Sequence, residues 1–437
     1  MTTLTFPLSR IEGHARVEIE VRDGEVLSTR FQAMEKRGFT LMVKGVPAEQ
    51  MPVIVPRICG VCSTAHHVAA VKTLEDAYGV TPPPLAGTIR ELLLLGQLVQ
   101  NQATSLFVFT MPDRLGTESI FHVSGEEASK KEQFHIARQS LMVRKLGTDL
   151  ITLAGGQFIH PVKAVVGGVS SGIDSGKAAA FQGRINEALP TACELVDTYW
   201  DISLRMKDRI GTWGDDQPAY YVTSTSAEKP NYDSSLIRVM APDGSDAGIF
   251  TPAQFYNATK FEETDYSYAG RTSFNNGVMR ANSLARANMT RSLDTPLADG
   301  FLKRLWSEFG NPAHPILLFD LCRGIELVYA LERAAEMLEL PLDDAETDVP
   351  YSPKDGEGWG LVEAPRGPLI HHYVVEGGKI AVGEFIIPTV HNMLAIERAL
   401  RVAAERYITA DSVNLELEKA VGRVVRAFDP CIACATH

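Results

Sequence analysis

Two short cysteine motifs stand near opposite ends of this sequence: RICGVCSTAH at residues 57–66 and DPCIACATH at residues 429–437. Each contains a Cys-x-x-Cys pair, Cys59 with Cys62 and Cys431 with Cys434. Two thiolates spaced in this way on a turn can bind one ion, and two such turns together offer four thiolates. The pairs therefore predict a metal site that joins the two ends of the chain.

The spacing of the cysteines alone leaves three interpretations open. A structural zinc ribbon is one, although ribbons normally close much shorter loops than the one between these pairs. A thioredoxin-like redox pair is another, but it needs a βαβ context and leaves the second pair unexplained. The third is a catalytic metal centre.

The composition is that of an ordinary globular protein. Of the 437 residues, 45% are hydrophobic and 22% are charged, which excludes long disordered or fibrous stretches and allows a large core. Lys and Arg number 42 against 54 Asp and Glu, and the net charge of −12 disfavours nucleic acid as a partner.

No segment is predicted to cross a membrane. The most apolar stretch, residues 92–111, contains four amide side chains and falls short of the roughly 18–20 uninterrupted apolar residues of a membrane span. The N-terminal residues lack the features of a signal peptide. We therefore expect a cytoplasmic protein with no transmembrane segment, and export together with a partner is the alternative.

Hydrophobic spacing predicts a mainly α-helical α+β fold with small β-hairpins at its periphery. Alternating apolar and polar residues predict hairpins over 16–33 and 373–382, and residues 213–275 show no clear period. No repeat or linker divides the chain, so residues 1–437 are expected to form one multi-lobed body that ends in a metal-binding tail at 429–437. Helices are expected over roughly 85–111, 127–154, 177–211, 317–339, 389–409 and 412–427.

The residues around the cysteines resemble the two cysteine signatures of the large subunit of nickel-iron hydrogenases, Arg-x-Cys-Gly-x-Cys-x-x-x-His and Asp-Pro-Cys-x-x-Cys-x-x-His. Further segments extend this resemblance over most of the chain: SRIEGH (9–14), GGQFIHP (155–161) and EAPRG (363–367). The resemblance implies the fold of that subunit together with the reversible, heterolytic cleavage of dihydrogen at a nickel-iron centre.

In this family four thiolates hold nickel, and two of them also bridge to an iron that carries cyanide and carbonyl ligands. By position in the motifs, the resemblance implies that Cys59 and Cys431 are terminal ligands of nickel and that Cys62 and Cys434 are bridging ligands. Soft thiolates suit both metals, because they donate electron density and tolerate changes of oxidation state.

The resemblance also implies a proton carrier. Glu12 of the SRIEGH motif would relay the proton released from dihydrogen, whereas the simpler interpretation of this residue is a surface salt bridge with Arg10. Two positions in the helix before Asp113 depart from the family's pattern, since Gln102 and Ser105 stand where relatives often carry histidines.

Polar groups are implied around the iron as well. Arg366, which follows Pro365, would lie over the iron with Asp113 and Asp429 as its carboxylate partners. A guanidinium is a rigid fork of donors suited to an anionic ligand such as cyanide. Thr389 would donate its hydroxyl to the other cyanide.

A histidine closes each cysteine signature, His66 and His437, and either could instead be a capped or exposed side chain. Because the family loses a C-terminal extension after the second histidine, the sequence is expected to represent the mature form. His437 and a backbone carbonyl near Phe385 match a buried magnesium-type site of the family. Thr40 stands where relatives commonly have a glutamate for that site, and a neutral hydroxyl is a poorer ligand for a hard cation.

The resemblance finally implies a partner. The sequence contains no dinucleotide-binding fingerprint and no further cluster-type cysteine series. Electrons are therefore expected to pass to an obligate iron-sulfur small subunit, and further electron-transfer subunits are an open addition. The alternative function is a hydrogen sensor with slow turnover. The related metal-free, quinone-binding subunit of respiratory complex I is disfavoured because all four cysteines are present.

Overall fold

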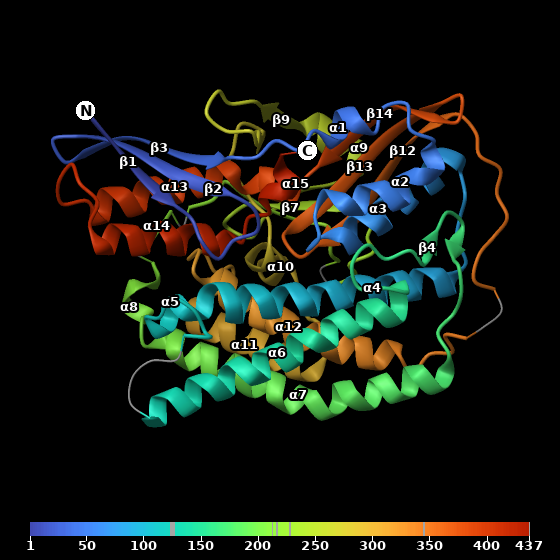
Figure 1. Cartoon of the computed structure of the whole chain (residues 1–437), viewed down its shortest axis with the longest axis horizontal. Helices are drawn as coiled ribbons and strands as arrows, with labels where there is room; N and C mark the ends of the chain where they lie inside the picture. The colour runs from blue at the N-terminus through green and yellow to red at the C-terminus, as the bar shows by residue number, and fades with distance from the viewer. Residues whose placement is uncertain (123–126, 212, 216, 227–228, 344–345, 437) are drawn as a thin grey trace.

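The computed structural model of the chain describes residues 1–122, 127–211, 213–215, 217–226, 229–343 and 346–436. In Figure 1 a layer of long helices forms the lower half of the molecule, and small sheets with further helices form the upper half. The helices of the lower layer are α4 (Pro84–Ala103), α6 (Glu127–Gly155), α7 (Ser175–Leu204), α11 (Pro296–Phe309) and α12 (Leu318–Met337). The mainly α-helical α+β prediction is confirmed.

Both predicted hairpins are present, and each gains a third antiparallel strand. The first is β2 (Ala15–Arg22) with β3 (Glu25–Ala33), extended by β1 (Thr2–Pro7). The second is β13 (Gly367–Glu376) with β14 (Lys379–Ile386), extended by β12 (Gly356–Ala364). Strand β2 alternates between buried and half-buried residues, which is the pattern that made the first hairpin predictable.

The stretch without a clear period, 213–275, forms most of a further sheet and a small hairpin. Its strands are short, and they pair over two to four residues, so no long alternation could appear in the sequence. The elements are β6 (Tyr220–Thr223), β7 (Ile237–Met240), β8 (Asp246–Phe250), α9 (Pro252–Ala258), β9 (Thr259–Glu262) and β10 (Arg271–Phe274), and β11 (Met279–Arg280) pairs with β6.

All six predicted helices are present, with differences at their ends. The first is interrupted, because α4 continues into a π-helical segment (Thr104–Thr110) and then α5 (Met111–Leu115). The third ends early and is followed by α8 (Lys207–Ile210). The last two are α13 (Pro388–Tyr407) and α14 (Leu415–Phe428), and the sheet β1-β2-β3 lies against α13 (Figure 1).

Helix α3 (Ser63–Tyr78) was not predicted, and its burial explains why. Nearly every side chain of this helix is buried, so no polar face gives it an amphipathic period. Helix α10 (Ser283–Met289) is buried along its whole length and was not predicted for the same reason. Helices of this kind are visible only once their neighbours are in place.

Three alternate glycines of β12 let α3 approach closely. A Cβ atom on Gly358 would lie 2.1 Å from the carbonyl oxygen of Thr73, and one on Gly360 would lie 2.3 Å from Thr73 Oγ1. A Cβ on Gly356 would similarly meet Ala77. The backbone of β12 therefore packs directly on α3, whose first residue follows Cys62.

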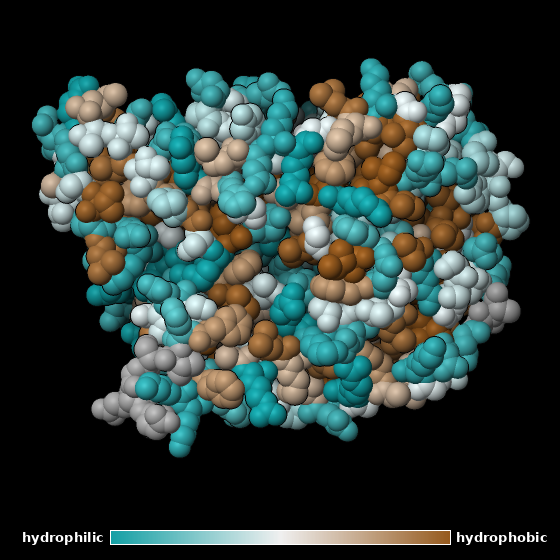
Figure 2. All heavy atoms as spheres, viewed as in Figure 1, coloured by the Kyte–Doolittle hydropathy of each residue, from teal (hydrophilic) through white to brown (hydrophobic). Residues whose placement is uncertain are grey.

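The larger hydrophobic core takes in side chains from Leu4 to Ala435, including all four cysteines of the two motifs. One helix, Pro84–Leu115, is long and apolar enough to cross a membrane, but 83% of its most apolar window is buried inside the protein, as in a core helix. On the face drawn in Figure 2, hydrophobic and hydrophilic residues are interspersed. That the chain forms one body stays a prediction.

Candidate metal centre

The four motif cysteines lie together in the interior. All are buried and free of disulfides, and their sulfur atoms lie within 4.8 Å of one another. Cys431 Sγ lies 3.3 Å from Cys59 Sγ, 3.8 Å from Cys62 Sγ and 2.9 Å from Cys434 Sγ. Because all four thiols converge, two independent thioredoxin-like pairs are excluded, and the donor set is one that binds soft metals.

Short backbone elements present these thiols. Cys59 has an extended backbone after a 3-10 turn (Val55–Ile58), and Cys62 immediately precedes α3. At the other end, Asp429 adopts a left-handed conformation (φ 50°) that ends α14, and Cys431 precedes the single-turn helix α15 (Ile432–Ala435). Each pair thus sits on a turn at the start of a helix.

The N-terminal SRIEGH segment holds the cysteine tail in place. Ile432 N donates to the carbonyl oxygen of Glu12 at 3.2 Å, and outside this segment Arg37 N donates to the carbonyl oxygen of Thr436 at 2.8 Å. Gly13 has a φ of +81°, and a Cβ at this position would lie 2.7 Å from Ile432 Cβ. Only glycine satisfies both the conformation and the close approach, so the motif has a packing role as well.

The side chain of Glu12 reaches one of the thiols. Its Oε2 lies 3.1 Å from Cys431 Sγ and accepts the backbone N–H of Ala433 at 3.0 Å. Burial raises the pKa of the Glu12 carboxyl above its usual value, against the effect of these two hydrogen bonds. Arg10 instead pairs with Asp113, so the alternative of a surface Glu12–Arg10 pair is wrong.

A buried guanidinium lies on the other side of the thiols. Arg366 Nη1 lies 3.3 Å from Cys62 Sγ, and Nη2 lies 3.0 Å from Asp429 Oδ1. Its Nε also donates to the carbonyl oxygen of Asp429. Burial opposes the charged form, but Asp429 and the neighbouring thiols hold the pKa of Arg366 well above its usual range. A permanent positive charge therefore faces the cysteine cluster.

His66 is neither exposed nor a cap. Its Nε2 lies 3.4 Å from Cys434 Sγ, and its Nδ1 lies 3.0 Å from His371 Nε2. His371 Nδ1 in turn lies 2.7 Å from Tyr373 Oη. Sequence reasoning missed His371 and Tyr373, although their i, i+2 spacing in β13 places both on one face of the strand.

A small cavity of about 10 Å³ opens at the cluster. Thr389 lies at its edge, and its hydroxyl oxygen accepts the backbone N–H of Cys431 at 3.0 Å, which leaves the hydroxyl proton to be donated elsewhere. Predicted site residues from four separate parts of the chain thus line the same cavity. The lining includes Cys62, His66, Pro365, Arg366, Thr389, Cys431 and Cys434.

Comparison with known proteins agrees with this geometry. A family model described as nickel-dependent hydrogenase matches residues 37–138 and 223–437, and a HoxL-like model matches residues 5–35. This chain belongs to the nickel-dependent hydrogenase family. By membership it is an oxidoreductase, the large subunit of a hydrogenase.

Its relatives include archaeal and bacterial enzymes. One chain of the F420-non-reducing hydrogenase vhu of Methanococcus voltae is 33% identical over 412 residues, which cover 91% of this chain and 97% of the relative. The beta chain of the NAD-reducing hydrogenase HoxS of Cupriavidus necator is 27% identical, with 99% and 93% covered. A crystal structure of an NAD+-reducing NiFe-hydrogenase superposes over the full length of both chains with a TM-score of 0.91 and 28% identity.

One residue of this hydrogenase subunit differs from the sequence-based prediction. Asp113 Oδ1 lies 2.6 Å from Arg10 Nη2, and its Oδ2 lies 2.6 Å from Arg426 Nε. The predicted pairing of Asp113 with Arg366 is therefore wrong. The physical reason is that two other guanidinium groups, those of Arg10 and Arg426, bind the Asp113 carboxylate, while Arg366 pairs with Asp429.

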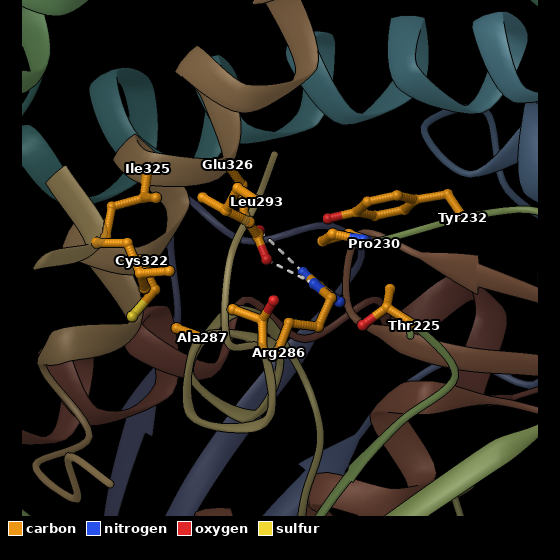
Figure 3. A pocket seen from close by; sticks show the side chains of 11 residues that line it. Thr225, Pro230, Tyr232, Arg286, Ala287, Leu293, Cys322, Ile325 and Glu326 are labelled. Atoms are coloured by element: carbon orange, nitrogen blue, oxygen red, sulfur yellow. Dashed lines mark hydrogen bonds and ion pairs between the residues drawn. The ribbon is translucent and has the colours of Figure 1, made fainter. Parts of the chain in front are cut away.

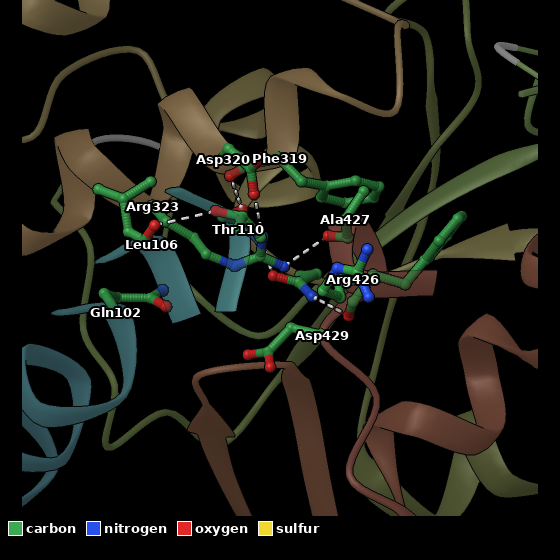
Figure 4. Close-up of polar contacts among 12 residues, drawn as sticks. Gln102, Leu106, Thr110, Phe319, Asp320, Arg323, Arg426, Ala427 and Asp429 are labelled. Carbon is green, nitrogen blue, oxygen red and sulfur yellow. Dashed lines mark hydrogen bonds and ion pairs between the residues drawn. The ribbon is translucent and has the colours of Figure 1, made fainter. Parts of the chain in front are cut away.

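Asn101 is a second side chain, besides Arg366, that binds Asp429. Its Nδ2 donates to Asp429 Oδ2 at 3.2 Å from within α4. Figure 4 shows Asp429 below the end of α14, where Arg323 donates to the carbonyl oxygen of Ala427 at 2.6 Å and pairs with Asp320 at 2.9 Å. In the sequence, the cluster of amides in this otherwise apolar helix was the feature from which a buried polar role of Asn101 could have been predicted.

The predicted second metal site stays a prediction. Phe385 is buried on β14 opposite His371, and Thr40 lies on the single-turn helix α1 (Phe39–Met42). Both line a hollow of about 840 Å³ that also reaches Ala435. His437 lies outside the described residues.

Gln102 and Ser105 are both buried, so the positions where relatives often carry histidines face the interior here. Gln102 Nε2 donates to the carboxylate of Glu326 on α12. The neutral amide of Gln102 therefore has a buried carboxylate as its hydrogen-bond partner.

Proposed function

We propose that this chain is the catalytic large subunit of a hydrogenase that cleaves dihydrogen heterolytically and reversibly at a nickel-iron centre. The observation that carries the proposal is the meeting of four buried thiols with a carboxylate on one side and a guanidinium on the other. A closed structural zinc site needs neither an acid-base group nor a buried cation beside its thiolates.

The residues fit the proposed centre. Cys59 and Cys431 would be terminal ligands of nickel, and Cys62 and Cys434 would also bind iron. Their sulfur atoms converge from both chain ends and offer the soft donors that nickel and low-spin iron prefer. When bound, the centre supplies the redox chemistry that takes up the two electrons of dihydrogen.

The chain itself would handle the proton. Glu12 Oε2 lies within hydrogen-bond distance of Cys431 Sγ, so a proton released at this sulfur has a carboxylate acceptor beside it. The Ala433 N–H fixes that carboxylate in place. The backbones at Glu12 and Cys431 also pair in an isolated β-bridge, which keeps the carboxylate close to the sulfur.

Arg366 and Thr389 would bind the anionic diatomic ligands of the iron. The guanidinium contacts Cys62, is held by Asp429 and lines the cavity, so its remaining N–H groups would donate to such a ligand. The Thr389 hydroxyl retains a proton to donate. Cyanide is an anion with a hydrogen-bond-accepting nitrogen, and carbonyl is a weak acceptor that suits the apolar side of the cavity formed by Pro365.

Electrons would leave through another chain. Among the described residues, the cysteines outside the cluster are Cys193 and Cys322, and these stand alone. A buried centre without its own relay needs iron-sulfur clusters nearby, so an obligate iron-sulfur small subunit is part of the proposal. A magnesium ion near His437 and a cytoplasmic location are proposed from the sequence only.

Metal analysis and infrared spectroscopy of the purified complex test the proposal. We expect about one nickel per chain, iron at the same site, no zinc there, and infrared bands of cyanide and carbonyl. Replacement of Cys431 by serine removes a terminal ligand and should abolish nickel binding, whereas Cys193→Ser should leave both metals unchanged. Stoichiometric zinc without infrared bands contradicts the proposal.

Activity measurements separate the catalyst from the alternatives. The complex should reduce a viologen dye with dihydrogen at a high rate, whereas a hydrogen sensor with the same metals should show exchange of hydrogen isotopes and only slow dye reduction. The isolated chain should reduce no dye. Equal rates for the isolated chain and the complex would show that the proposed electron exit is wrong.

A further inference from the structure

A buried ion pair lies behind the loop that carries Arg366. Arg286 on α10 faces Glu326 on α12, with Nε 2.5 Å from Oε1 and Nη2 2.9 Å from Oε2 (Figure 3). Both side chains are almost fully buried. The pair touches none of the four metal-binding thiols, and the mechanism proposed above does not use it.

The rest of the guanidinium holds the arginine loop. Arg286 Nη1 donates to Glu363 Oε1 at 2.6 Å and to the carbonyl oxygen of Ala364 at 3.3 Å, and Nη2 donates to the carbonyl oxygen of Pro365 at 2.7 Å. All five N–H groups of Arg286 therefore have acceptors. Three of these acceptors belong to the three consecutive residues that precede Arg366.

A second path leads from the same ion pair to the partner of Arg366. Gln102 Nε2 donates to Glu326 Oε2, and Gln102 Oε1 accepts from Asn101 Nδ2 at 3.3 Å. Asn101 Nδ2 also lies 3.2 Å from Asp429 Oδ2, and Asp429 Oδ1 binds Arg366. The contacts close a ring, so both the backbone and the carboxylate that orient Arg366 are tied to the same pair.

We propose that the Arg286–Glu326 ion pair positions the Arg366 guanidinium over the metal centre. Arg286 and Glu326 are positioning residues, because they touch neither thiol nor ligand and act through the loop and through Asp429. The inference rests on the proposed function, since it concerns where Arg366 presents its donors. A lysine at position 286 has three N–H donors in place of five and no planar fork, so it cannot hold all the acceptors at once.

Another buried pair provides a matched control. Arg90 binds Glu75 through two hydrogen bonds of 2.8 and 2.6 Å and donates to the carbonyl oxygens of Val165 and Gly168. It is as buried as Arg286 but holds a turn outside the metal site. Arg90→Lys therefore reproduces the loss of a buried guanidinium without moving Arg366.

The test compares Arg286→Lys, Gln102→Met and Arg90→Lys in the large subunit purified with its partner. The cavity beside Arg286, about 20 Å³, has room for one water molecule that can satisfy groups left by the lysine. We expect Arg286→Lys to retain nickel and iron, to shift the infrared bands of the cyanides, and to lower turnover by about 100-fold, the scale expected for a misplacement of about 1 Å. Gln102→Met should shift the same bands less, and Arg90→Lys should leave them unchanged.

Each result decides between the possibilities. Band shifts in Arg286→Lys or Gln102→Met that are missing in Arg90→Lys support the inference. Unchanged bands in every metal-containing variant overturn it. If Arg286→Lys fails to assemble, Gln102→Met decides alone, and unchanged bands there overturn the inference. Missing cyanide and carbonyl bands in the unmodified complex would instead show that the proposed function is wrong.

Discussion

Replacing Glu12 by glutamine removes one chemical property and little else. The glutamine Oε1 can take the position of the carboxylate Oε2, which accepts the N–H of Ala433 at 3.0 Å and lies 3.1 Å from Cys431 Sγ, and the NH2 group then takes the place of the other carboxylate oxygen. Size and hydrogen bonding are therefore kept. What is lost is the ability to take up a proton from the thiol and release it.

The expected loss follows from that geometry. A positioned acid-base group contributes typically about 10²- to 10⁴-fold to a rate, which corresponds to about 3–5 kcal/mol of activation free energy. Because Glu12 is the carboxylate in hydrogen-bond contact with Cys431, we expect most of this loss in the variant. The metals should still assemble, since no thiol is changed.

The assay is the exchange of hydrogen isotopes between dihydrogen and solvent, measured together with dye reduction, metal content and infrared bands. Glu397→Gln is the matched control. Glu397 on α13 is likewise a largely buried carboxylate that accepts a backbone N–H, that of Phe31 at 3.2 Å, and burial raises its pKa as well. It makes no contact with the cysteine cluster, so its variant should exchange at the normal rate.

Nearly full exchange in Glu12→Gln with intact metals would refute the reasoning, because the proton would then leave the thiols by another group. An equal loss of exchange in Glu12→Gln and Glu397→Gln would point to a general effect of removing a buried charge. Loss of metal from Glu12→Gln would mean that the carboxylate supports assembly and not only proton transfer.

Three further predictions follow from the structure. Gly360→Ala should destabilise the protein by about 1–3 kcal/mol, since its Cβ would lie 2.3 Å from Thr73 Oγ1, and heat inactivation should show it. Burial lowers the pKa of His391 to about 4, so the folded state binds fewer protons than the unfolded state below about pH 6.5. Stability should therefore fall by about 3 kcal/mol as the pH falls from about 6.5 to about 4, and His391→Gln should flatten that dependence in denaturant titrations at several pH values. Tyr373→Phe removes the hydrogen bond to His371 Nδ1 and should cost about 1 kcal/mol while keeping both metals, which thermal unfolding and metal analysis can check.

Local patterns in the sequence determined several features of this hydrogenase subunit. Alternation about Asp23-Gly24 and Gly377-Gly378 marked both hairpins, because a strand with one buried face repeats every two residues. The long amphipathic helices were found for the same reason, with a period of 3.6. The cysteine motifs indicated the metal site because the spacing within each pair is itself local.

Other features depended on packing between distant segments. Helix α3 has no polar face to give it a period, and its position is set by the bare glycine backbone of β12. Of the two carboxylates expected beside Arg366, Asp429 pairs with it, but Asp113 is held by Arg10 and Arg426, and only the tertiary structure brings Asn101 beside Asp429.

The ring from Arg286 through Glu326 to Asp429 joins elements far apart in the sequence. Buried polar side chains show no periodic pattern in the sequence, because the partner that satisfies the hydrogen bonds of each one is supplied only by the tertiary structure. The sequence by itself therefore determined which four cysteines come together and the kind of metal that their thiols favour. The tertiary structure decided which charged groups face those thiols and what holds these groups in position.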